Sequence, residues 1–134
     1  MRNFALRLIS YEAKEHKSAG SKSPAVFQSC ERLHLYLAIF MGVAGSRSLF
    51  SRALGLGTAE VPWLRAVRMK EDGSLEGLDD LQAKLDRNAL HEGGVVLLAQ
   101  LLGLLVAFIG GNQTVRLVRE VWPKVLLNDL DLEN

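Results

Sequence analysis

The sequence predicts a mainly α-helical bundle with one long central helix and a dimeric core. Residues 93–111 form a nineteen-residue stretch without a charged side chain, and residues 33–45 form a second apolar run. Hydrophobic residues make up 49% of the chain, which has only three prolines, so long buried helices are favoured. A length of 134 residues fits one domain. We therefore expect residues 1–134 to form a single helical domain.

The N-terminal part is expected to contain two helices. Apolar residues recur at helical spacing near the start, so residues 1–22 are interpreted as an N-terminal helix followed by a flexible connector. Ser23 and Pro24 then form a helix-start signal for an apolar helix over 27–44. The Gly-Ser step at 45–46 predicts a bend or restart in that helix.

The C-terminal part is expected to hold a small hairpin and the long helix. Two short runs flank an Asp-Gly pair within residues 65–78, a pattern typical of a β-hairpin. The central helix is predicted over 89–122, with Asn88 as its N-terminal cap. Residues 123–134 alternate leucine with acidic side chains and are interpreted as a tail.

Small residues recur every fourth position along both apolar helices. Each set forms a ridge without side-chain bulk, where a second helix can approach closely. Glycine inside a helix costs roughly 1 kcal/mol relative to alanine, so a compensating close contact is expected. We predict that the two ridges face each other, within one chain or across a dimer axis. A symmetric dimer would allow the amide at position 100 to pair with its own copy. The predicted interface comprises Ala38, Gly42, Ser46, Ala99, Gln100, Gly103, Ala107 and Gly111.

Charge is divided unevenly along the chain. Residues 1–70 carry eleven Lys or Arg against four Asp or Glu, whereas residues 71–134 carry five against eleven. The basic residues are spread out with few aromatics between them, which disfavours nucleic-acid binding. We interpret the basic half as a surface for a protein partner. Its candidate residues are Arg47, Arg52, Trp63, Arg65 and Arg68.

Candidates for catalysis or metal binding are few. Cys30 and His34 stand four residues apart with Glu31 between them, and His91 or His16 could add a third ligand. Closed metal sites usually carry paired Cys or His motifs, so a buried thiol and a hydrogen-bonded helix histidine are favoured instead. We expect no enzymatic activity, no metal, no cofactor and no small-molecule substrate.

The sequence favours a non-enzymatic, homo-oligomeric interaction or regulatory module, most simply a dimer. A lone cysteine and the lack of a secretory signal favour the cytoplasm. Two alternatives remain open. The first is a small membrane protein that oligomerises through helix 93–111, because that stretch is long enough to span a bilayer. The second is a sensor that binds a small apolar ligand between its helices.

Overall fold

A computed structural model describes residues 1–16 and 24–123 and confirms the mainly α-helical class. The predicted connector at 17–23, which includes Ser23, and the tail at 124–134 lie outside the described residues. The elements in chain order are α1 (Arg2–His16), α2 (Ala25–Thr58), the 3-10 helix η1 (Pro62–Ala66), β1 (Arg68–Met69), β2 (Leu75–Glu76), α3 (Leu78–Lys84), α4 (Arg87–Ile109) and α5 (Gly111–Val121).

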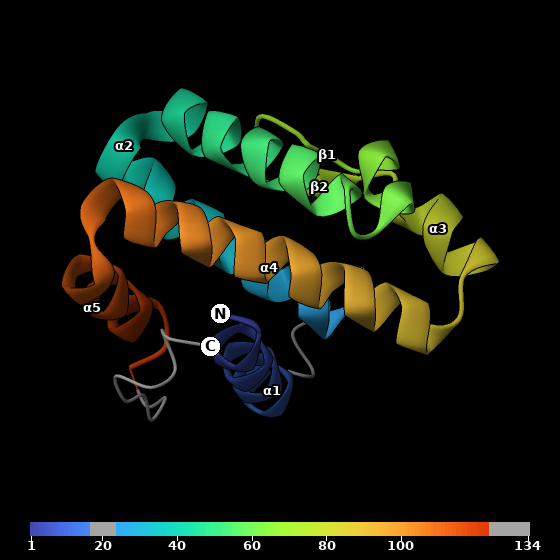
Figure 1. The fold of residues 1–134 in the computed structure, drawn as a ribbon, viewed down its shortest axis with the longest axis horizontal. Coiled ribbons are helices and arrows are strands. Elements are labelled where there is room, and N and C mark those ends of the chain that lie inside the picture. The colour runs from blue at the N-terminus through green and yellow to red at the C-terminus, as the bar shows by residue number, and fades with distance from the viewer. Residues whose placement is uncertain (17–23, 124–134) are drawn as a thin grey trace.

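Helix α4 forms the centre of the fold. It packs against α1, α2 and α5, and α2 doubles back at a bend so that its first half passes behind α4 and its second half runs alongside (Figure 1). Five leucines of α4 are fully buried, and burial of a leucine contributes roughly 1.5–3 kcal/mol. These are Leu97, Leu98, Leu101, Leu102 and Leu105. The apolar stretch at 93–111 therefore supplies much of the core of the described chain.

The prediction of one long helix over 89–122 is wrong, because the chain bends at Gly110 and continues as the separate helix α5. The bend predicted in the first apolar helix at 45–46 is instead at Gly42. Gly42 has φ 83° and ψ 159°, and Gly110 has φ 86° and ψ 162°. This region of backbone space is essentially restricted to glycine, which explains why both helices bend at these residues. Both bends lie at the same end of the molecule, opposite α3 (Figure 1).

The start of α4 also differs from the prediction. Asp86, rather than Asn88, is the N-terminal cap, and its Oδ1 accepts a hydrogen bond of 2.7 Å from the backbone N–H of Ala89. An aspartate in this position satisfies one of the free N–H groups of the first turn. The cap therefore lies two residues before the predicted position.

The predicted hairpin is confirmed, although its strands are short. Met69 pairs with Leu75 in the antiparallel register, and Gly73 in the connecting turn has φ 89°. Glu31 of α2 accepts a hydrogen bond of 3.1 Å from the backbone N–H of Leu75. The ring of His34 lies so close to Gly73 that a Cβ there would overlap it. The hairpin is thus held against the first half of α2.

Candidate functional site

The structure separates the residues of the two predicted small ridges. Gly42 is exposed at a bend, and an added Cβ at either Gly42 or Gly103 would meet nothing within 4 Å. Gly111 belongs to α5 rather than to α4, while Ala38 and Ala99 are half-buried and Ala107 is exposed. The prediction that the ridges face each other within one chain is therefore wrong. The alternative, that the two ridges meet across a dimer axis, stays a prediction.

Two other residues of that predicted interface already have partners in the chain. Ser46 is buried, and its Oγ lies 2.7 Å from Nδ1 of His34. Gln100 donates from Nε2 to Oε2 of Glu60 over 3.3 Å. The expected pairing of Gln100 with its own copy is thus not needed to satisfy its amide.

Close helix packing at glycine does occur, but at different residues. An added Cβ on Gly93 would overlap the indole of Trp63, and one on Gly94 would overlap the side chain of Val26. Trp63 is half-buried in this contact, so much of its ring is unavailable as an anchor for a partner. Gly93 and Gly94 are therefore the positions where a missing side chain lets a neighbouring residue approach the helix closely.

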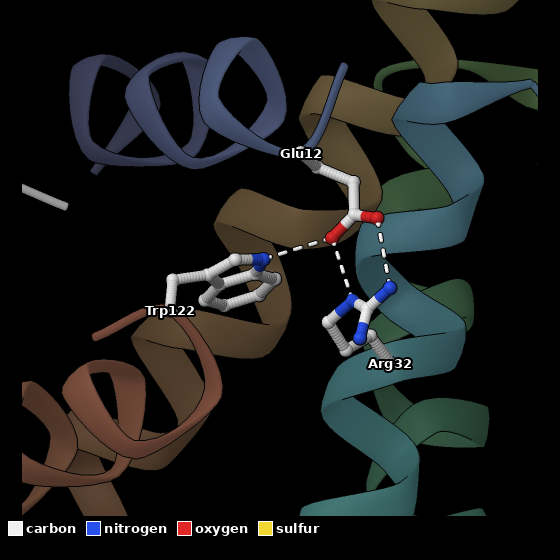
Figure 2. Close-up of polar contacts among 3 residues, drawn as sticks. All are labelled: Glu12, Arg32 and Trp122. Carbon is white, nitrogen blue, oxygen red and sulfur yellow. Dashed lines mark hydrogen bonds and ion pairs between the residues drawn. The ribbon is translucent and has the colours of Figure 1, made fainter. Parts of the chain in front are cut away.

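A buried polar cluster joins α1, α2 and the residue that follows α5. Glu12 of α1 has no exposed surface, and its Oε1 accepts hydrogen bonds of 2.8 Å from Nε of Arg32 and from Nε1 of Trp122 (Figure 2). Arg32 also donates from Nη2 to Oε2 over 3.3 Å. Sequence reasoning missed this cluster. One signal was present, because Glu12 follows Phe4 and Leu8 at four-residue spacing on the buried face of α1.

The residues best suited to nucleophilic or metal chemistry lie inside the core. His34 is only 2% exposed and packs edge-on against the ring of Phe50. Burial lowers the pKa of His34, the charge of Arg47 lowers it further, and Asp72 opposes both effects. Burial raises the pKa of the Cys30 thiol, which disfavours the reactive thiolate. The preferred interpretation of a buried thiol and a hydrogen-bonded histidine is confirmed.

Three of the five predicted partner-surface residues come together. Arg47 of α2, Arg65 of η1 and Arg68 of β1 line one cavity of about 420 Å³. Arg52 lines a different hollow, next to Phe108 of α4. The fold thus brings three of the five residues to one place, while their role as a surface for a protein partner stays a prediction.

Large apolar side chains are exposed where both helices bend. We call this surface the apolar end and define it by Ile39, Phe40, Val43 and Phe108, which are 85%, 61%, 46% and 66% exposed. A hollow of about 670 Å³ lies between the two helices here and is lined by Phe108 of α4 and by Leu49 and Arg52 of α2. Exposed apolar patches of this kind mark contact surfaces more often than scattered single residues do.

Comparison with known proteins gives no guidance on function, because the chain matches no family model, no curated protein and no solved structure. Two helical segments, Val26–Thr58 and Arg87–Ile109, are long and apolar enough to cross a membrane. In their most apolar windows, 33% and 50% of the residues are buried within the chain. The fold and its surface thus define a mainly helical protein with an apolar end and an arginine-lined cavity.

Proposed function

We propose that this protein is a non-enzymatic interaction module that self-associates as a dimer through the apolar end. The observation that carries the proposal is the exposure of Ile39, Phe40 and Phe108 at one end of the molecule. These side chains leave water when they are covered, and burial of apolar area contributes about 25 cal/mol per Å² before the costs of association.

A second copy of the chain is the partner that suits this surface best. The apolar end lies within stretches of the sequence that carry no Asp, Glu, Lys or Arg, namely residues 33–46 and 93–115. Depletion of charge is typical of the centre of a protein–protein interface. A two-fold contact brings the same patch together on both copies, so its four apolar side chains meet their own image without charge repulsion. The one charged side chain that lines the adjoining hollow is Arg52.

The absence of enzymatic activity is part of the same proposal. The carboxylate of Glu12, the ring of His34 and the hydroxyl of Ser46 are all buried and engaged in hydrogen bonds within the chain. A general acid, base or nucleophile has to lie within hydrogen-bond reach of a substrate. These internal bonds support a structural role for the three groups.

Sedimentation velocity over a range of protein concentrations tests the proposal. We expect the wild type to form dimers, and Ile39→Ser and Phe108→Ser to shift the equilibrium to monomers. Leu56→Ser is the matched control, because Leu56 is also exposed, at 43%, but lies on the second half of α2 outside the apolar end. A monomeric wild type, or equal dimerisation of all variants, would overturn the proposal.

A second candidate, association with a bilayer, is favoured by the two apolar helices. In that case Ile39 and Phe108 would contact lipid rather than a second copy. Flotation of the protein with phosphatidylcholine vesicles separates the two proposals. Recovery with vesicles that is lost in Phe108→Ser supports the membrane, whereas dimers that stay out of the vesicle fraction support self-association.

A further inference from the structure

We propose that the cavity between the second half of α2 and the η1–β1 segment binds a phosphate monoester group. Its volume of about 420 Å³ falls within the range of roughly 300–1,000 Å³ that is typical of small-ligand pockets. Arg47, Arg65 and Arg68 line it. The site uses none of the residues of the apolar end, so it stands independently of self-association.

Arg47 is a half-buried residue in the wall of the cavity. Its Nε donates a long hydrogen bond of 3.4 Å to the backbone carbonyl of Met69, which orients the rest of the guanidinium. Within residues 1–16 and 24–123, no carboxylate forms an ion pair with Arg47. A partly buried cation without a counterion is costly, and a bound anion would offset that cost.

Two more cations reach the same cavity from the other wall. Arg65 lies in the last turn of η1 and Arg68 begins β1, and both are exposed. Arg68 stands opposite Glu76 in the hairpin, but no ion pair joins them in the described part of the chain. The rim is therefore net positive and offers guanidinium groups, whose forked geometry matches phosphate oxygens.

The interior of the cavity indicates an organic substituent on the anion. Leu54, Leu64, Val67 and Met69 are buried residues that line it. Ser51 adds an exposed hydroxyl that can donate a hydrogen bond. A phosphate monoester carries about −1.5 to −2 charges and three acceptor oxygens, so it matches three arginines better than a carboxylate does.

Titration of the full chain, followed by ¹H–¹⁵N NMR, tests the site. We expect phenyl phosphate to produce saturable shifts at the backbone amides of Leu64 and Val67, and to bind more tightly than inorganic phosphate or benzoate. Arg65→Gln is expected to raise the Kd about tenfold, because hydrogen bonds to charged groups are among the stronger ones. Arg52→Gln is the matched control and should bind like the wild type.

Vesicles distinguish a soluble phosphate ester from a lipid headgroup. Phosphatidic acid presents a phosphate monoester, so binding only to phosphatidylcholine vesicles that contain it, and loss of that binding in Arg65→Gln, assigns the site to a headgroup. Saturable binding of free phenyl phosphate assigns it to a soluble ligand. Arg65 makes no hydrogen bond or ion pair in the described chain, so its variant is expected to fold. The proposal is overturned by no binding of any probe, or by equal effects of Arg65→Gln and Arg52→Gln.

Discussion

The carboxylate of Glu12 on α1 binds one residue of α2 and the residue that follows α5. Its partners Arg32 and Trp122 lie 20 and 110 residues away in the sequence. Because removing one member of a buried ionic contact leaves the other charge without a partner, the three side chains depend on one another. The four-residue spacing of Glu12 after Leu8 was an unused signal for a buried position on α1, and no local pattern could indicate which residues would meet it.

Replacement of Glu12 should therefore cost far more than replacement of a carboxylate in an exposed ion pair. We expect Glu12→Ala to lower the free energy of unfolding by about 3–5 kcal/mol, because the Trp122 N–H and the Arg32 guanidinium lose their acceptor. Glu92→Ala is the control, since Glu92 binds Arg2 with two hydrogen bonds of 2.7 Å at the surface, and should cost at most about 1 kcal/mol. Urea unfolding measures both, and equal losses would contradict the account.

His34 makes stability depend on pH. Its folded pKa is lowered by burial and by Arg47, so the unfolded chain binds the proton more readily than the folded chain. The contribution of neutral His34 to the free energy of unfolding is complete above the unfolded pKa of about 6.5. This contribution is lost as the pH falls through that value toward the folded pKa. We expect the free energy of unfolding to decrease as the pH is lowered from 7.5 to 5.

Urea unfolding at several pH values checks this prediction. His34→Gln should flatten the dependence in that window, because glutamine does not titrate. His91→Gln, at an exposed position on α4, should leave the slope as in the wild type. A slope that persists in His34→Gln would show that another group controls the dependence.

Among the helices, the glycines divide into three kinds that periodicity cannot distinguish. Gly42 and Gly110 bend the chain, Gly93 and Gly94 admit neighbouring side chains, and Gly103 is an ordinary helical residue next to open space. Gly42 lies within the apolar run 33–45, and the other four glycines lie within the apolar run 93–111, so the apolar pattern gives no sign of a difference between them. The sequence therefore predicts the helical segments, but the positions of the bends depend on which glycine the rest of the fold requires to turn.

Alanine substitutions separate the bend glycines from the helical one. Gly42→Ala and Gly110→Ala should each lower the free energy of unfolding by about 1–3 kcal/mol, because alanine is strained in this backbone conformation even though the space is open. Gly103→Ala should raise it by up to about 1 kcal/mol, because alanine favours a helix. Urea unfolding of the three variants is the measurement. A Gly42→Ala variant as stable as Gly103→Ala would contradict the account of the bend.

At the scale of the whole molecule, the sequence predicted the class of fold and the hairpin because both follow from local patterns. Apolar runs at helical spacing require buried helices, and an Asp-Gly pair between short runs favours a tight turn. The arginines of the cavity were named from residue type alone, as candidates for a surface that binds a protein partner. Their convergence could not be predicted, because Arg47 lies on α2 while Arg65 and Arg68 arrive through a turn after that helix ends.

The apolar end was hidden from sequence reasoning for a related reason. Ile39 and Phe108 lie in apolar runs that look uniformly buried, yet both are exposed, and each lies within three residues of the glycine at which its helix bends. Exposure of this surface is the basis for proposing that two copies meet there. In the proposed dimer, the apolar end of one copy therefore faces the apolar end of the other.

Distances between spin labels on the two copies test that claim most directly. Ala107→Cys places a label beside the apolar end and Ala83→Cys places one on α3 at the opposite end, each in a Cys30→Ala background. We expect pulsed electron paramagnetic resonance to give a short, narrow distance distribution for position 107 and a much longer one for position 83. A shorter distance for position 83, or no dipolar signal at either position, would contradict the proposed dimer.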